Sequence, residues 1–258
     1  MSSEEQVSVW AEAATGAERR LWFSDLLGFL RGSQMITHSL RGCIINLLVL
    51  FFAALSAPAQ TLAVPGAGFP IDVLVQSPAL TDTDLQAICL FRPDPGSTLR
   101  GSLKEIDEKL GGVLSQVRQT GLFSGALGET LLITPRPGTI PARRLMIIGL
   151  GDLAGFSPDR EQEVGFVLFA EAERLGIRHP YFAPTVLDGG KEGVDTGDVA
   201  QQFLSGLLRA KATQDLLQHA GVSTGTTPIS LTFLAGAAHA ERSRAGLALA
   251  IKSLHNQK

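Results

Sequence analysis

One short segment, residues 143–149, restricts the fold more than any other part of this chain. Its centre reads Leu-Met-Ile-Ile, so a strand formed there would have no polar face. A strand that faces water on one side alternates apolar and polar residues, whereas a strand covered on both faces is apolar throughout. The segment therefore predicts a sheet with helices packed on both of its faces.

From residue 71 onward, short apolar runs alternate with helical patterns. Further strands are predicted at residues 71–76, 85–91, 129–134, 177–182 and 229–234. Helices are predicted at residues 102–117, 157–175, 198–219 and 240–254. This alternation is typical of a three-layer α/β/α domain with a largely parallel or mixed sheet. We expect one such domain over residues 71–258.

The first of these helices has the clearest pattern. Apolar residues recur three or four positions apart at Leu103, Ile106, Leu110, Val113 or Leu114, and Val117. Ser102 is followed three positions later by Glu105, which is the form of a capping box at a helix N-terminus. The pattern predicts one amphipathic helix with a single buried face.

Residues 35–59 have the composition of a secretory signal peptide. Met35 and Arg41 precede a largely apolar run at 43–54, and Ala57 and Ala59 stand at the minus-three and minus-one positions before Gln60. The apolar run is shorter than the roughly 20 residues that span a bilayer. We expect cleavage after Ala59 and an exported protein, periplasmic or secreted. An uncleaved membrane anchor is the main alternative, and residues 60–70 are expected to form a linker.

Residues 1–34 precede this signal as a doubtful N-terminal extension. Counted from Met1 the signal peptide would have 59 residues, and counted from Met35 it has 25, against a usual range of about 15–30. Either the true start is Met35, or the extension is a genuine long leader whose apolar residues form a helix face. Both interpretations stay open.

Composition excludes several kinds of function for the part after residue 59. Residues 1–59 hold four arginines and five acidic residues, which leaves 18 basic and 20 acidic side chains in the remaining 199 residues. This balance gives no electrostatic reason to expect nucleic acid as a partner. Cys43 lies in the signal, so Cys89 has no partner in the same mature chain. A disulfide scaffold and a paired-cysteine zinc site are therefore not expected.

Three segments in order carry a resemblance to a known family. They are Leu-Lys-Glu-Ile-Asp-Glu-Lys-Leu-Gly-Gly-Val-Leu at 103–114, Gly-Leu-Phe-Ser-Gly-Ala-Leu-Gly-Glu-Thr-Leu-Leu at 121–132, and Ala-Arg-Arg-Leu-Met-Ile-Ile-Gly-Leu-Gly-Asp at 142–152. This part of the chain resembles the N-terminal domain of leucyl (cytosol) aminopeptidases. The resemblance implies a macro-domain-like α/β/α fold that contributes to oligomer contacts.

The resemblance implies that the chemistry in that family belongs to a C-terminal domain that holds two metal ions. Its Asn-Thr-Asp-Ala-Glu-Gly-Arg run does not occur in the 258 residues. Two such ions generate the attacking hydroxide and polarise the peptide carbonyl, and no side chain of a lone α/β domain replaces them. We therefore expect no catalytic residue, no metal, no cofactor and no enzymatic activity.

The candidate site with the most physical support is a glycine-containing loop. Gly149, Gly151 and Asp152 follow a predicted strand and precede a predicted helix, and Gly111 and Gly112 form a second glycine pair. Backbone amides after a strand can bind phosphate. The alternative is structural: Gly149 and Gly151 permit a tight turn, and Gly112 permits close approach to a neighbour.

Other residue patterns are weaker. The five histidines are not at metal-ligand spacing. Ser223 lies in a Gly-Val-Ser-Thr-Gly run without the strand-to-helix context of a nucleophile elbow, and Asp82 and Asp84 suggest a solvated turn.

Three functions remain. The first is an exported interaction or oligomerisation module that binds itself or another envelope protein. The second is a macro-like domain that binds a nucleotide or phosphorylated sugar. The third is the regulatory half of a split metalloaminopeptidase, partnered by a separate catalytic chain. Contact with a membrane is expected only if the signal stays uncleaved.

Overall fold

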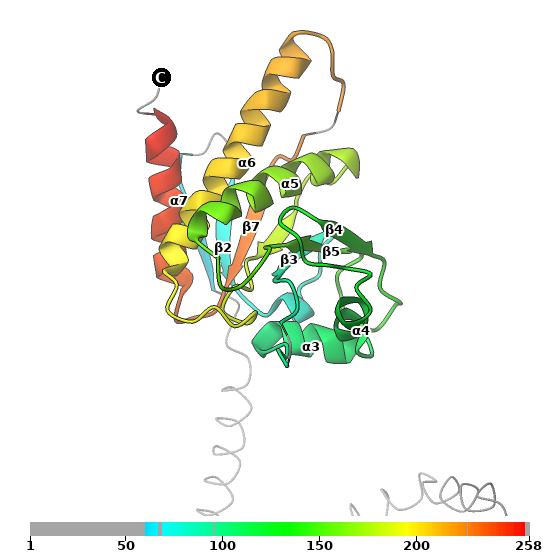
Figure 1. Ribbon diagram of the computed structural model, residues 1–258. Coiled ribbons are helices and arrows are strands. Elements are labelled where there is room, and N and C mark those ends of the chain that lie inside the picture. Colours follow the sequence, from blue (N-terminus) through cyan, green and yellow to red (C-terminus); the bar gives the residue numbers. More distant parts are fainter. Residues whose placement is uncertain (1–59, 67–68, 95, 226, 256–258) are drawn as a thin grey trace, which may run out of the picture. The chain divides into compact units, whose positions relative to one another are not determined.

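A mixed seven-stranded sheet runs through the part of the chain that this computed structural model describes, which is residues 60–66, 69–94, 96–225 and 227–255 (Figure 1). The strand order is β1-β2-β7-β6-β3-β5-β4. The strands are β1 (Thr61–Val64), β2 (Ile71–Val75), β3 (Gln86–Leu90), β4 (Thr130–Ile133), β5 (Leu145–Gly149), β6 (Tyr181–Ala183) and β7 (Leu231–Ala235). The five central strands are parallel, and β1 and β4 pair antiparallel at the two edges. The predicted mixed sheet is confirmed.

The centre of the sheet is apolar on both faces. Every residue of β3 and of β5 is buried, and the two strands pair in parallel with Ile88 opposite Ile147. Successive side chains of a strand point to opposite faces, so Cys89 belongs to one hydrophobic cluster and Ile88 and Leu90 belong to another. The strand predicted to be covered on both faces is covered on both faces.

Helices form the two outer layers, as Figure 1 shows. The first cluster lies between the sheet and α5 (Glu161–Arg174), α6 (Thr196–His219) and α7 (Ala240–His255), and the second lies between the sheet and α3 (Gly101–Lys109) and α4 (Val113–Gln119). Two short 3-10 turns, η1 (Pro78–Leu80) and η2 (Pro158–Arg160), complete the described elements. The three-layer α/β/α architecture is therefore confirmed. Among the described residues, no helix is both long and apolar enough to span a membrane.

The prediction of one helix over residues 102–117 was wrong, because two helices occupy this region. Gly111 and Gly112 separate α3 from α4 and have φ values of +70° and +82°. That left-handed backbone is cheap only for glycine. The Asp107 carboxylate then accepts hydrogen bonds from the amides of Leu114 (2.8 Å) and Ser115 (3.2 Å), which satisfies the first turn of α4.

The predicted capping box was also wrong. The N-cap of α3 is Arg100, and the Ser102 amide donates to Asp188 Oδ2 at 3.0 Å rather than bonding within the helix. The Glu105 carboxylate accepts a hydrogen bond from the Ser77 hydroxyl at 2.7 Å. Both polar side chains bond to residues that are distant in the sequence, so a local sequence pattern could not predict these contacts.

The expected linker at residues 60–70 contains the edge strand β1, which pairs with β2. The Gln60 carbonyl accepts a hydrogen bond from the Val75 amide at 3.0 Å, so this pairing begins at the first described residue. The doubtful extension 1–34 and the signal at 35–59, with Ala57 and Ala59 of the predicted cleavage site, lie outside the described residues.

Helices α5 and α6 pack closely because glycines face each other's backbones. A Cβ atom added at Gly206 of α6 would overlap the carbonyl oxygen of Gln162 on α5. A Cβ added at Gly165 of α5 would overlap the carbonyl oxygen of Phe203 on α6 in the same way. These contacts set the separation of α5 and α6 over the sheet.

Gly206→Ala tests this packing. Alanine is ordinarily more favourable than glycine inside a helix by about 1 kcal/mol, but here we expect it to destabilise the protein by about 1–3 kcal/mol because the two backbones must separate. Urea unfolding of the wild type and the variant measures the difference. Thr213→Ala, at an exposed position of the same helix, should change stability by less than about 0.5 kcal/mol. A stabilised Gly206→Ala protein would contradict the close contact.

Glu161, the first residue of α5, is fully buried, and neither of its carboxyl oxygens has a hydrogen-bond partner among the described residues. Burial raises the pKa of the Glu161 carboxyl well above its ordinary value of 4.5. Burial also raises the pKa of the Cys89 thiol, and the charge of Glu161 raises it further. Ionisation of Glu161 is thus disfavoured in the folded protein.

The pH dependence of stability should therefore carry a signature of Glu161. A raised folded-state pKa means that this residue costs no stability below pH 4.5, and that the cost grows as pH rises from there toward the folded pKa. At pH 8 we expect Glu161→Gln to be more stable than the wild type by more than about 1 kcal/mol, and therefore to melt at a higher temperature. The advantage should shrink as the pH falls to about 4. A stability difference between the two proteins that stays constant from pH 8 to pH 4 would contradict the prediction.

Candidate functional site

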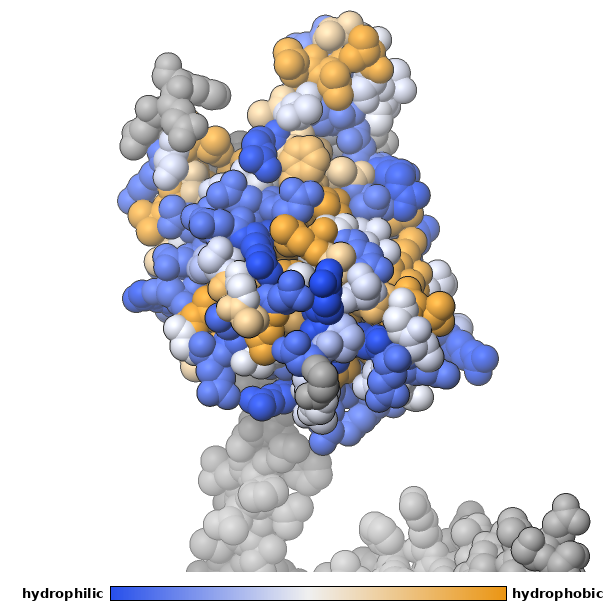
Figure 2. Space-filling model, in the orientation of Figure 1, coloured by the Kyte–Doolittle hydropathy of each residue, from blue (hydrophilic) through white to orange (hydrophobic). Residues whose placement is uncertain are grey.

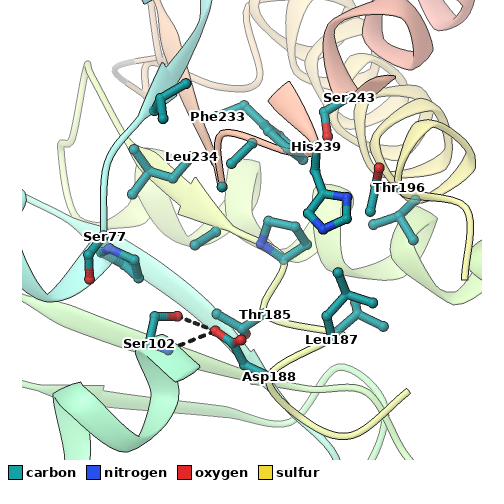
Figure 3. A pocket seen from close by; sticks show the side chains of 18 of the residues that line it. Ser77, Ser102, Thr185, Leu187, Asp188, Thr196, Phe233, Leu234, His239 and Ser243 are labelled. Carbon is teal, nitrogen blue, oxygen red and sulfur yellow. Dashed lines mark hydrogen bonds between the residues drawn. The ribbon is translucent and has the colours of Figure 1, made fainter. Parts of the chain in front are cut away.

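A cavity of about 450 Å³ opens at the carboxyl ends of β2, β6 and β7. Its lining comes from both helical layers as well as from the strand ends (Figure 3), and comprises Val75, Gln76, Ser77, Pro78, Ser102, Ala183, Pro184, Thr185, Val186, Leu187, Asp188, Val194, Thr196, Val199, Phe233, Leu234, Ala235, Gly236, His239 and Ser243. In open α/β sheets, ligands bind in the crevice outside the carboxyl ends of the strands. This cavity is therefore the candidate functional site.

Thr185 is the residue at which the sheet opens. The parallel pairing of β3 with β6 ends at Ile88 and Ala183. At the next residue of β3, the Cys89 amide donates to the Thr185 hydroxyl oxygen at 2.9 Å. The same hydroxyl donates to the Cys89 carbonyl at 2.7 Å. A side chain thus replaces the next rung of the ladder, and the chain after β6 turns away from β3.

This turn imposes strain on Thr185. Its φ is +48°, and among the described non-glycine residues it alone has a positive φ. Left-handed backbone is a genuine outlier for a β-branched residue. Strain of this kind persists only where the surroundings enforce it, and it concentrates at functional sites. The strained residue here lines the cavity.

The apolar wall of the cavity rests on a rigid aromatic cluster. Phe233 of β7 lines the cavity and packs edge-on against Phe182 and Phe203, with both pairs of ring centroids 5.8 Å apart. Phe182 and Phe203 stack on each other at 3.9 Å between centroids. All three side chains are fully buried. An apolar cavity wall of this kind suits the apolar surface of a ligand.

Asp188 supplies the carboxylate of the cavity. Its Oδ2 accepts hydrogen bonds from the amide of Ser102 at 3.0 Å and from the Ser102 hydroxyl, both drawn in Figure 3. Gly101 has a φ of +49°, and a Cβ added there would overlap the Asp188 carboxylate. The Asp188 carbonyl also accepts a hydrogen bond from the Arg100 amide at 3.2 Å. The loop after β6 is thus fastened to the N-terminus of α3.

His239 and Thr196 offer polar groups that the protein itself does not use. Figure 3 shows the imidazole of His239 projecting into the cavity, opposite Asp188 and beside Thr196. Neither side chain has a hydrogen-bond partner among the residues that the structure describes. A neutral imidazole provides one donor and one acceptor, and a hydroxyl provides both. These groups can orient a bound molecule.

The glycine loop predicted from the sequence lies elsewhere. The amides of Gly149, Leu150 and Gly151 donate to the carbonyls of Glu129 (2.8 Å), Leu90 (2.9 Å) and Gly125 (2.8 Å). A Cβ added at Gly149 would overlap the carbonyl oxygen of Ala126, and Gly151 has a φ of +73°. Asp152 forms an exposed ion pair with Arg92 at 3.4 Å. The structural role expected as the alternative accounts for these glycines, and none of the three predicted loop residues lines the cavity.

Gly111 and Gly112 make the turn between α3 and α4. A Cβ added at either would meet no atom within 4 Å, so backbone conformation rather than close packing requires glycine there. Neither residue lines the cavity. Within the described parts of the chain, no three His, Cys, Asp or Glu side chains are grouped as metal ligands would be.

Sequence reasoning did not identify Thr185, Asp188 or His239 as site residues. One signal could have found Asp188 and His239. The glycine-rich run at 188–193 begins with Asp188 and follows the predicted strand at 177–182. His239 lies in the loop after β7, and loops at the carboxyl ends of parallel strands meet at one edge of the sheet.

Comparison with known proteins matches part of this chain to a family. The sequence model of the cytosol aminopeptidase family, N-terminal domain, matches residues 88–218, slightly more than half of the chain. A probable cytosol aminopeptidase of Thermosynechococcus vestitus is 26% identical over 132 residues, which cover 49% of this chain and 24% of that protein. One of Roseiflexus castenholzii is 31% identical over 117 residues, covering 45% and 21%. The chain thus spans about a quarter of the length of these relatives.

Solved structures agree on the fold. A mutant tomato leucine aminopeptidase superposes with a TM-score of 0.51 at 21% identity, covering 70% of this chain and 35% of that one. The Oceanobacillus iheyensis macrodomain with bound MES superposes with a TM-score of 0.50 at 14% identity, covering 78% and 100%. At these identities the likeness concerns the fold, which is macrodomain-like. The sequence match and the fold together show that the chain belongs to the cytosol aminopeptidase family, through that family's N-terminal domain.

Proposed function

We propose that this domain binds a small organic molecule in the cavity at the carboxyl ends of β2, β6 and β7. The observation that carries the proposal is the cavity itself. Its volume of about 450 Å³ lies within the range of small-molecule sites, about 300–1,000 Å³, and its apolar walls with a few convergent polar groups are typical of them. The strained Thr185 at its rim adds to this support.

The proposed role is binding without catalysis. The sequence match lies within the N-terminal domain of the family, whereas the relatives named as aminopeptidases are about four times as long as the matched region. Asp188, the carboxylate of the cavity, is held by Ser102 as a helix cap. These features favour recognition of a molecule over its chemical conversion.

A bulky residue in the cavity lining should abolish binding. Val194 lines the cavity and is only partly buried, so Val194→Trp should fill part of the cavity while the fold is retained. We expect ligand-observed NMR of a fragment library to find ligands of the wild type whose signals recover in Val194→Trp. A tryptophan at Leu122, which is 78% exposed and does not line the cavity, should leave binding unchanged. Equal binding by all three proteins would place the ligands outside the cavity.

A second function, an interaction module, is favoured by the far end of α6. This helix projects beyond the sheet in Figure 1, and Figure 2 shows apolar surface gathered over its tip. Leu216 is 68% exposed and Val222 is 71% exposed, with Leu217 beside them. Exposed apolar patches of this kind mark contacts with other molecules. We propose that a second copy of the chain covers this patch, since like apolar patches pair isologously around a twofold axis.

Export belongs to the same proposal. The signal pattern at residues 35–59 supports cleavage before Gln60 and a periplasmic or secreted module. Another envelope protein or a separate aminopeptidase catalytic chain would be a different partner for the same surface.

Native mass spectrometry of the protein recovered from its host tests both proposals. We expect a subunit mass of residues 60–258 and a dimer of that mass. Leu216→Glu should shift the population to monomer, because the charge would be buried in the interface. Leu122→Glu, the same change at a 78% exposed site after α4, should remain dimeric. A wild-type monomer would contradict self-association, and a complex with a different protein would replace the second copy with that partner.

A further inference from the structure

The cavity has an unbalanced charge. Among its lining residues Asp188 is the one carboxylate, and none is a lysine or arginine. Two arginines that are close in sequence to lining residues form ion pairs: Arg100 pairs with Glu192 at 3.1 Å, and Arg242 pairs with Asp195. A ligand entering the cavity therefore meets a negative charge and no lysine or arginine in the lining.

The N-terminus of α3 is a site that attracts anions, and the Asp188 carboxylate already occupies it. Amides at the N-terminus of a helix attract anions, and the first helix after β3 directs its N-terminus toward the cavity through Ser102. The amide and the hydroxyl of Ser102 both donate to Asp188 Oδ2. The missing Cβ of Gly101 makes room for the carboxylate. A phosphate would have to displace a tethered anion and remain beside its charge.

Asp188 nevertheless keeps capacity to bind. Both of its side-chain hydrogen bonds use Oδ2, and Oδ1, which lies against Gly101, accepts none among the described residues. The residue is half-buried at the cavity wall, where a charge interacts more strongly than in open water. Across the cavity lie the apolar side chains of Phe233 and Leu234 and the imidazole of His239 (Figure 3). Asp188 lines the cavity together with these apolar side chains, and a carboxylate in such a lining suits a molecule with one cationic donor group and an apolar body.

We propose that the cavity selects an amine with an apolar body, held through the Asp188 carboxylate, and that the same carboxylate rejects phosphorylated ligands such as nucleotides. This inference rests on the proposed ligand-binding function and names the class of its ligand. It assigns Asp188 two roles, as the cap of α3 and as the selectivity group of the cavity. The nucleotide or phosphorylated sugar expected from the sequence alone is then the excluded class.

Two probes of equal shape and opposite charge test the proposal. Phenethylamine and phenylacetate share an aromatic ring and a short chain, and ADP represents phosphorylated ligands. Their binding to the wild-type protein is measured by NMR titration at mildly alkaline pH, which keeps free histidine uncharged. We expect phenethylamine to bind at least about tenfold more tightly than phenylacetate, a difference of about 1.4 kcal/mol, and ADP not to bind.

Asp188→Asn separates the charge from the shape. Asparagine keeps an oxygen that can accept from Ser102, so α3 stays capped, and thermal melting checks that the variant is folded. The preference for the amine should disappear in this variant. Asp159→Asn, at an exposed residue that does not line the cavity, should retain it. The comparison of the two probes on the wild type does not depend on any variant.

The outcomes separate this inference from the function on which it rests. Phenylacetate or ADP binding as tightly as the amine would overturn the ligand class and leave a ligand-binding cavity. A tenfold preference that survives in Asp188→Asn would overturn the role of Asp188. If neither these probes nor the fragment library binds, the proposed ligand-binding function fails, and the inference fails with it.

Discussion

The paired hydrogen bonds between the Thr185 hydroxyl and the backbone of Cys89 are the contact on which the site depends. The β3–β6 ladder ends at the Ile88–Ala183 pair, and beyond that pair the Thr185 side chain replaces a backbone rung. The chain then leaves β3, and the loop that follows β6 lines the cavity at the carboxyl ends of β2, β6 and β7. The left-handed backbone of Thr185 is strained, and strain of this kind persists only where the surroundings enforce it.

The loop that Thr185 redirects joins the two helical layers across the sheet. Asp188 reaches from the end of β6 to Ser102 of α3, and Asp195 a few residues later caps α6 through the amide of Gly197 at 2.8 Å. The loop therefore fixes the N-termini of two helices on opposite faces. A single carboxylate can thus stabilise the fold and set the charge of the cavity, which couples ligand preference to local structure.

The element pattern and the layers were predictable because they follow from local periodicity. The buried strand β5 and the amphipathic face of α3 and α4 read directly from apolar spacing. The failures were at polar residues. Ser102 and Glu105 fit a local cap but bond to Asp188 and Ser77, which are distant in sequence. The glycine loop at 149–152 had the pattern of a phosphate site, yet its amides pair with strands and loops that only the sheet brings near.

The sequence by itself determined the three-layer architecture, the family resemblance and the single cysteine after residue 59, because each depends on residue type and spacing alone. The tertiary structure decided where the cavity lies, which side chains line it and which of their polar atoms remain free. Those properties depend on contacts between segments far apart in the chain, such as Cys89 with Thr185 and Ser102 with Asp188. A hydrogen-bonding group has no preference for a partner until folding places one within reach, and the partner then decides whether the group serves the fold or a ligand.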